Sequence, residues 1–315
     1  MCAGFAPRVL VPRPAPLARA RRPTRGRMGD CLVSSASGPD PASGDGGVTL
    51  LTFDIDGTLI RAVGESANRL HKDAFAHAMR VVCQVDTNID VIKHHGSTDQ
   101  LVLADVLRHH GVDETRIWEA MPEMMREMVE YFESHEADAA EGLELLPGVE
   151  RLLEALSERE DVIVCLVTGN LEPIARGKME KLGVWRYFTP PPPGKSAQTP
   201  ILGGFGSDHT RRDALVRLAR DRAARAFDLT EETASGLSKS VPDEPRFRDR
   251  VHFGDTPNDV AAAAAAGALA FAVTTGVFSR PELEAHFQGL PDPKRCVVFD
   301  GLEDTWAVLE ACGLE

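Results

Sequence analysis

Residues 48–58 read VTLLTFDIDGT, and this stretch decides the fold class. Its first six residues form a short, nearly all-apolar run of high β propensity, typical of a strand buried on both faces of a parallel sheet. Two carboxylates, Asp54 and Asp56, follow at once, and Gly57 would let the chain turn sharply after them. Open α/β sheets bind their ligands at the carboxyl ends of the strands. The stretch therefore predicts a central strand with a binding site at its end.

The rest of the chain alternates strand-like apolar runs with helical patterns. We expect further strands at 162–167, 251–254, 269–274 and 296–299, and helices at 149–156, 174–182, 212–226, 259–266 and 302–309. This order predicts an α/β fold with a doubly wound, parallel, Rossmann-like sheet. A mostly helical block at about 66–136 interrupts the order after the first strand. We expect an inserted α-helical cap at 64–141, and a catalytic core formed by 47–63 and 142–315.

The first 46 residues differ from the rest in composition. They are rich in Arg, Ala, Pro, Ser and Gly, and no acidic residue precedes Asp30. This composition matches a transit peptide for a chloroplast or mitochondrion, although a plain disordered tail, or a true start at Met28, would also explain it. Without such a signal the expected location is cytoplasmic.

Charge and hydropathy limit the partners. The net charge is −13, of which residues 1–46 contribute +4, so the remainder carries −17. An acidic body argues against a broad nucleic-acid footprint, which needs clustered basic residues. No run approaches the about 18–20 uncharged apolar residues of a membrane span. We therefore expect no nucleic-acid and no membrane partner, while the oligomeric state stays open.

Carboxylates recur after the first and third predicted strands. Asp54 and Asp56 would repel each other unless a cation sat between them, and Mg²⁺ suits them because it takes carboxylate, carbonyl and phosphate oxygens. A solvated turn is the alternative, since Asp and Gly are common there. The third strand is followed by 254–259, GDTPND. Asp255 is a candidate metal ligand, direct or through water, and Asp259 either supports that site or begins a helix.

The second strand is followed by Thr168-Gly169-Asn170. A hydroxyl and free backbone N–H groups at a helix entrance make an oxyanion site, although the same tripeptide is also an ordinary cap and turn. The predicted cap carries two further ambiguous features. The loop 94–99 is either a specificity element facing a phosphate or a turn with a helix cap, and the Met121–Met128 stripe is either a ligand surface or, as we prefer, core.

In this order, the three motifs resemble those of the haloacid dehalogenase superfamily. The resemblance covers about residues 48–312. Within the superfamily, the chain resembles in particular the phosphoglycolate-phosphatase-like members with a helical cap. The resemblance implies that Asp54 is a nucleophile that forms an aspartyl-phosphate and also binds Mg²⁺. It implies that Asp56 is the general acid and then the general base, with its backbone carbonyl on the metal. Asp255 would be the remaining carboxylate on the metal.

The resemblance also implies which residues surround this chemistry. Thr168 and Gly169 would bind the phosphoryl group, while Gly57, Thr58 and Asp259 would support the site. The family further needs a basic residue between the second and third motifs, usually a Lys followed by Pro, and no such pair occurs there.

The candidates for that basic residue are Lys178, Arg211 or Arg212, and, less suitably, Lys195. We favour Arg212, because the preceding segment 203–209, GGFGSDH, resembles a subgroup with Arg at that place. Lys178 has an alternative interpretation as a solvated helix residue.

These observations predict a magnesium-dependent phosphatase acting on a small-molecule phosphate ester. An acid at Asp56 suits the departure of an ester oxygen, which needs a proton. The cap type suits phosphoglycolate-like or small sugar phosphates. A sugar phosphomutase on the same scaffold is the alternative. A non-catalytic protein of the same fold is a third hypothesis, which the presence of Asp54, Asp56 and Asp255 disfavours.

Overall fold

The computed structural model describes residues 47–64, 66–188, 201–229, 247–288, 290 and 292–315. The predicted transit peptide and Lys195 lie outside the described residues. Within them, six parallel strands form one sheet in the order β5-β4-β1-β6-β7-β8. The strands are β1 Thr49–Phe53, β4 Val162–Thr168, β5 Gly204–Phe205, β6 Arg250–Gly254, β7 Leu269–Val273 and β8 Val297–Phe299. The prediction of an α/β fold with a parallel sheet is confirmed.

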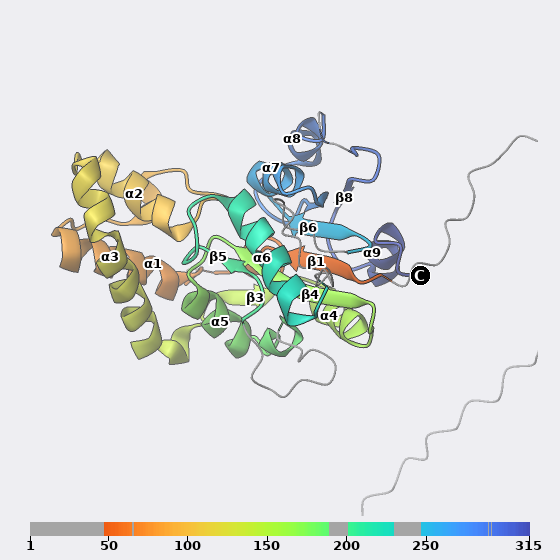
Figure 1. Ribbon diagram of the computed structural model, residues 1–315. Helices are drawn as coiled ribbons and strands as arrows, with labels where there is room; N and C mark the ends of the chain where they lie inside the picture. The colour runs from red at the N-terminus through yellow and green to blue at the C-terminus, as the bar shows by residue number, and fades with distance from the viewer. Residues whose placement is uncertain (1–46, 65, 189–200, 230–246, 289, 291) are drawn as a thin grey trace, which may run out of the picture. The chain divides into compact units, whose positions relative to one another are not determined.

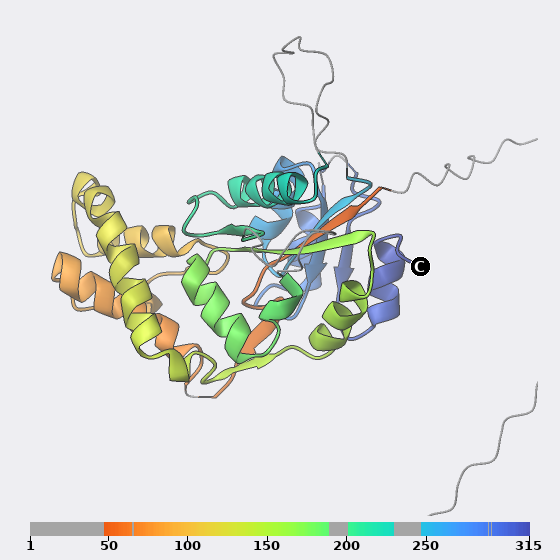
Figure 2. The same ribbon diagram turned by 60° about the horizontal axis from the view of Figure 1, so that its bottom comes forward.

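Helices cover both faces of this sheet (Figure 2). On one face, α4 (Val149–Ser157), α5 (Glu172–Lys181) and α9 (Thr305–Ala311) share an apolar cluster with Leu51 and Phe53 of β1. On the other face, α6 (Arg212–Ala226) and α7 (Pro257–Ala265) pack on the sheet, and Leu50 contributes to this side. Successive β1 side chains thus enter opposite cores, which explains why its sequence is mostly apolar. A short helix, α8 (Arg280–Ala285), lies between β7 and β8 in the chain.

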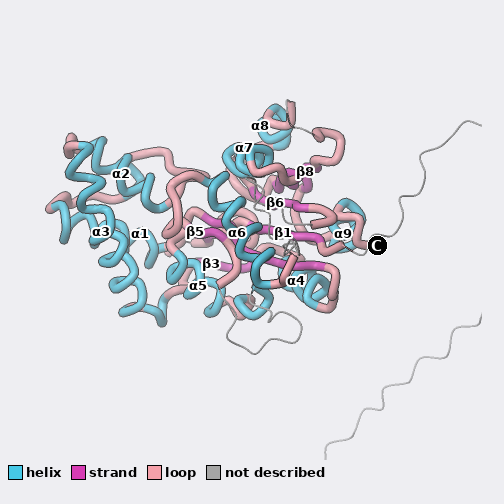
Figure 3. Tube along the Cα trace, in the orientation of Figure 1, coloured by secondary structure: helices cyan, strands magenta, loops and turns pink. Residues whose placement is uncertain are grey.

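A separate layer of helices follows β2 (Ile60–Ala62) in the chain. It contains α1 (Arg69–Cys83), α2 (Asp99–His109) and α3 (Glu114–Ser134), with short 3-10 turns at Ile89–Val91 and Glu136–Asp138. These helices share an apolar cluster of their own, which also includes Ile89, Ala139 and, from the start of α5, Leu171 and Ile174. Figures 1 and 3 show them beyond the carboxyl ends of the strands. None of the helices in the described part of the chain is long and apolar enough to cross a membrane.

The methionine stripe of α3 divides between two environments. Met121, Met124 and Met128 are buried in the helical layer. Met125 is half-buried and lines a cavity of about 570 Å³ between α3, the start of α5 and β5. Met121, Met124 and Met128 are therefore core residues, as we expected, whereas Met125 faces the cavity.

Three short strands and one short helix are absent from the sequence prediction. β2 pairs antiparallel with β3 (Leu143–Leu145), so the two chain segments that connect the helical layer to the sheet are hydrogen-bonded to each other. β5 has two residues, and α8 has six. Such short elements leave too few residues for a detectable period of two or 3.6.

Candidate functional site

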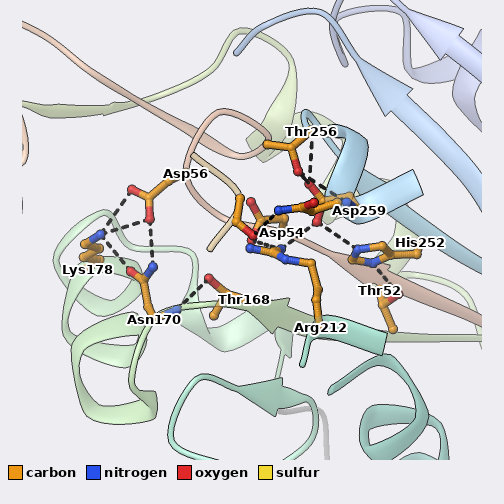
Figure 4. A network of polar contacts seen from close by, with 12 residues as sticks. Thr52, Asp54, Asp56, Thr168, Asn170, Lys178, Arg212, His252, Thr256 and Asp259 are labelled. Carbon is orange, nitrogen blue, oxygen red and sulfur yellow. Dashed lines mark hydrogen bonds and ion pairs between the residues drawn. The ribbon is translucent and has the colours of Figure 1, made fainter. Parts of the chain in front are cut away.

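The three predicted motifs meet at one edge of the sheet. β4, β1 and β6 are adjacent, and parallel pairing brings their carboxyl ends together. Thr168 ends β4, Asp54 follows β1 and Asp255 follows β6. All three side chains are almost completely buried. The strand order therefore places side chains that are more than eighty residues apart in the sequence in one site (Figure 4).

Arg212, the first residue of α6, joins two of the carboxylates. Its Nη1 donates to Asp54 Oδ1 at 2.9 Å and to Asp259 Oδ1 at 2.6 Å. Burial raises the pKa of Asp54 to about 6, although Arg212 opposes this shift. Burial would also raise the pKa of Asp259, but Arg212 and His252 outweigh it and hold that pKa at about 2. The guanidinium thus lies where a phosphate bound next to Asp54 would need positive charge.

Asp54, Asp255 and Asp259 form a cluster with the properties of a cation site. Each offers one carboxylate oxygen, and these oxygens lie within 4.8 Å of one another. Asp255 Oδ1 is buried and has no hydrogen-bond partner among the described residues. A Cβ at Gly57, whose φ is +90°, or at Gly276 would collide with the Asp255 carboxylate. A hard ion such as Mg²⁺ fits this donor set, because it binds oxygen ligands and would satisfy the orphaned oxygen.

The electrostatics of Asp255 predict a measurable response to Mg²⁺. Burial, followed by the charges of Asp259 and Asp54, raises its pKa to about 9 in the metal-free protein. Metal binding must displace that proton, so the apparent Mg²⁺ affinity should increase about tenfold per pH unit below this pKa. We expect Mg²⁺ to raise the thermal unfolding midpoint of the full-length protein, and to raise it more at pH 8 than at pH 6. Differential scanning fluorimetry checks this. In Asp255→Asn the Mg²⁺ shift should disappear, and an undiminished shift there would contradict the site.

Asp56 and Lys178 form a second polar group beside the first. Lys178 Nζ donates to both carboxylate oxygens of Asp56 at 3.1 Å and to Asn170 Oδ1 at 2.8 Å. The Asn170 amide in turn donates to Asp56 Oδ2 at 3.0 Å. The Lys178 side chain is 0% exposed, against 38% for Asp56. The alternative interpretation of Lys178 as a solvated helix residue is therefore wrong.

Lys178 and Arg212, the two favoured basic candidates, contact different aspartates. Lys178 holds Asp56, whereas Arg212 holds Asp54 (Figure 4). Burial would raise the pKa of Asp56, but Lys178, His71 and Asn170 together lower it below the usual value. Arg211, the third candidate, is exposed and pairs with Asp213.

Thr168, Gly169 and Thr58 lie at the same edge. The Asn170 backbone N–H donates to Thr168 Oγ1 at 3.3 Å. The Thr58 hydroxyl is buried and has no hydrogen-bond partner among the described residues. A Cβ at Gly169 would collide with the carbonyl of Ser97. Glycine at 169 thus allows the helical layer to approach the end of β4 closely.

The loop 94–99 contacts the sheet edge directly. Asp99 N donates to Gly169 O at 2.8 Å, and Asp99 Oδ2 accepts from Leu171 N at 2.8 Å. Thr98 Oγ1 donates to Thr210 O at 3.1 Å, and Asn258 Nδ2 donates to Gly96 O at 3.0 Å. Thr98 is the N-cap residue of α2, but its side chain makes no cap bond. The Thr98 hydroxyl donates to Thr210 instead. The interpretation as a turn before a helix is therefore correct for the backbone, but the Thr98 side chain does not cap the helix.

Two buried polar residues of the site were not singled out from the sequence. His252 contacts Asp259, and His71 Nε2 lies 3.1 Å from Asp99 Oδ2. His252 had a detectable signal, because it is a polar residue within a strand that otherwise reads as apolar. His71 had none, since polar residues near helix starts are common. Asn170 was named as part of the Thr168-Gly169-Asn170 motif, but the contact of its side chain with Asp56 was not predicted.

Comparisons with known proteins identify a family and a shared fold. A family model described as haloacid dehalogenase-like hydrolase matches residues 48–199, and one described as HAD-hydrolase-like matches 216–305. None of the curated proteins compared with the sequence matches it.

Among solved structures, a predicted phosphatase from Clostridium acetobutylicum is similar at 17% identity and a TM-score of 0.52, covering 84% of this chain and 99% of that one. A mutant of CbbY from Rhodobacter sphaeroides in complex with xylulose-(1,5)bisphosphate is similar at 21% identity and a TM-score of 0.51, covering 82% and 96%. A hydrolase from Pseudomonas syringae is similar at 19% identity and a TM-score of 0.50, covering 83% and 98%. These likenesses show a shared fold.

Proposed function

The chain belongs to the haloacid dehalogenase-like hydrolases, and we propose that it is a magnesium-dependent phosphatase that hydrolyses a small-molecule phosphate monoester through an aspartyl-phosphate on Asp54. One observation carries the proposal. Asp54 is a buried carboxylate at the end of the central strand, bonded to Arg212 and clustered with Asp255. A carboxylate kept free of water and beside a fixed cation can attack a phosphorus atom whose charge the cation neutralises.

In the first proposed step, an Asp54 carboxylate oxygen forms a bond to phosphorus while the ester O–P bond breaks. The departing alkoxide takes a proton from Asp56. The pKa of Asp56 lies below its usual value in the free protein, so this step requires the negative charge of the bound ester to raise that pKa until Asp56 is protonated. Arg212, the Thr168 hydroxyl and the backbone N–H at Gly169 hold the phosphoryl oxygens. In the second step, water attacks phosphorus and gives a proton to Asp56, and the bond to Asp54 breaks to release phosphate. Bound magnesium, held by Asp54, Asp255 and the Asp56 carbonyl, would neutralise part of the phosphoryl charge.

We propose that Lys178 orients Asp56, while Arg212 serves as the basic residue of the phosphate site. The ammonium bonds to both oxygens of Asp56 and therefore limits rotation of that carboxylate. Asn170 contacts both partners and completes a triangle. A general acid or base must lie within hydrogen-bond reach of the proton that it transfers. A fixed carboxylate meets this requirement at every turnover.

For the substrate, we propose phosphoglycolate-like or small sugar phosphates. The helices α1–α3 stand over the carboxyl ends of the strands and would act as a cap that restricts the size of the ester (Figure 1). The similar CbbY structure was solved with a sugar bisphosphate. This likeness supports small sugar phosphates as candidates.

An activity screen of the full-length protein tests the proposal. We expect hydrolysis of p-nitrophenyl phosphate and of one or more phosphates in a metabolite panel when Mg²⁺ is present, and loss of activity with EDTA. Hydrolysis of no ester with Mg²⁺ would overturn the proposal. A reaction that returns the phosphoryl group to a sugar and requires a sugar bisphosphate would instead identify a phosphomutase.

A further inference from the structure

His252 is a buried polar side chain that the proposed reaction does not use. It lies on β6, is 1% exposed, and stands opposite Thr52 of β1 in the parallel ladder. Thr52 is 2% exposed. Each of them stands between two apolar residues of its strand. Burying such groups has a cost unless they are hydrogen-bonded, so their partners are informative.

Both ring nitrogens of His252 have partners. Nδ1 lies 3.0 Å from Thr52 Oγ1, and Nε2 lies 3.3 Å from Asp259 Oδ1. A carboxylate oxygen offers only lone pairs, so the Nε2 position carries the hydrogen and donates to Asp259. The Thr52 hydroxyl has one hydrogen, which it can donate either to Nδ1 or to the carbonyl oxygen of Val251, 3.1 Å away. Thr52 of the neighbouring strand therefore holds the ring at Nδ1, and Nε2 points at Asp259.

Asp259 is held by donors on both oxygens. Oδ2 accepts from the Thr256 backbone N–H at 3.1 Å and from its hydroxyl at 2.6 Å. Oδ1 accepts from His252 and from Arg212 Nη1. The same Arg212 nitrogen donates to Asp54 (Figure 4). A continuous chain of contacts thus runs from Thr52 through His252, Asp259 and Arg212 to Asp54.

We infer that His252, held by Thr52, is a positioning residue that fixes Asp259 so that the Arg212 guanidinium stays on the nucleophile Asp54. The inference rests on the proposed phosphatase function. A single Arg212 nitrogen serves two carboxylates, so the direction of its N–H bonds depends on where Asp259 Oδ1 lies. The terminal torsion of Asp is broad, and the donor on Oδ1 from His252 restricts it. Displacements of about 1 Å in a catalytic group can cost about a hundredfold in rate.

Three variants of the full-length protein test this role. His252→Leu fills the space without a donor, and we expect kcat to fall about tenfold with KM changed by less than about twofold. His252→Gln retains a side-chain N–H near the Nε2 position, and we expect kcat within about threefold of the wild type. Thr52→Val removes the hydroxyl and should lower kcat in the same direction by a smaller factor. His109→Leu, an exposed histidine of α2, is the control.

A merely structural histidine would give a different pattern. His252→Leu and His252→Gln would then lower the thermal midpoint and leave kcat of the folded protein unchanged, which would overturn the inference. If His252→Leu does not fold, an unchanged kcat in Thr52→Val would overturn it equally.

Crystal structures of the wild type and His252→Leu supply a readout that does not depend on turnover. We expect the Arg212 Nη1 to Asp54 Oδ1 distance to leave hydrogen-bonding reach in the variant. An unchanged distance overturns the inference. This readout remains valid if the wild type hydrolyses no ester, a result that would overturn the proposed function alone.

Discussion

Asp54→Asn is expected to lower the Mg²⁺-dependent hydrolysis of p-nitrophenyl phosphate by at least about a thousandfold. An amide lacks the negative charge that makes the carboxylate oxygen nucleophilic enough for the proposed attack on phosphorus. Its oxygen can still accept the Arg212 hydrogen bond, so the neighbouring side chains keep their partners. Steady-state rates measure the loss, and circular dichroism checks that the fold is retained.

The same variant should not be less stable without metal at neutral pH. Burial raises the Asp54 pKa from 3.8 to about 6 in the folded protein. A raised carboxyl pKa contributes stability that is present below pH 3.8 and is lost as the pH rises through about 6. Asparagine avoids this loss, so Asp54→Asn should gain stability relative to the wild type as the pH rises from 4 to 7. Asp73→Asn, an exposed acid of α1, is the matched control and should change neither rate nor stability. Full activity in Asp54→Asn would disprove the mechanism.

Lys178→Met and Arg212→Met should both lower activity, but Arg212→Met should lower the free energy of unfolding more. Removing Arg212 leaves Asp54 and Asp259 facing each other, with side chains only 6% and 2% exposed. Breaking a buried ion pair on one side costs about 3–5 kcal/mol, so we expect a loss of that size in the free energy of unfolding and almost no activity. Removing Lys178 leaves Asp56, whose side chain is 38% exposed and can reach water. We expect a smaller loss of stability and a fall in kcat of about ten- to a hundredfold.

Urea denaturation and steady-state kinetics of the two variants separate these outcomes. Arg126→Met is the control, because Arg126 is an exposed arginine of α3 whose ion-pair partners among the described residues are glutamates of the same helix. A wild-type kcat in Lys178→Met would show that Lys178 has no role in the reaction. Equal losses of stability in both variants would mean that the exposure of the remaining carboxylate does not matter, contrary to this expectation.

Much of the fold could be predicted because its elements are locally encoded. β1 and β4 read as buried strands, and α6 was predicted with the bounds that it has in the structure. The carboxylates after β1 and β6 were found because parallel strands present their carboxyl ends together. These features depend on residue type and spacing, which a single sequence displays.

The remaining features depend on neighbours that only the folded chain supplies. The burial of Lys178 follows from the position of α5 beside Asp56, and nothing in the period of that helix reveals it. Lys178 and Arg212 were treated as alternatives because each is a cation between the same two motifs. Their separate partners follow from the arrangement of α5 and α6 on opposite faces of the sheet. Likewise, the pairing of β2 with β3 joins residues more than eighty positions apart.

The bonds between the loop 94–99 and the sheet edge have a kinetic consequence. Four hydrogen bonds join Gly96, Thr98 and Asp99 to the core. At about 1 kcal/mol net for each, breaking these four bonds would cost about 4 kcal/mol, so that the loop would be released in about one molecule in a thousand at any moment. If alcohol and phosphate leave only through that minority state, product escape and not bond breaking would set the turnover number. Faster turnover would then be gained by weakening the hydrogen bonds of this loop.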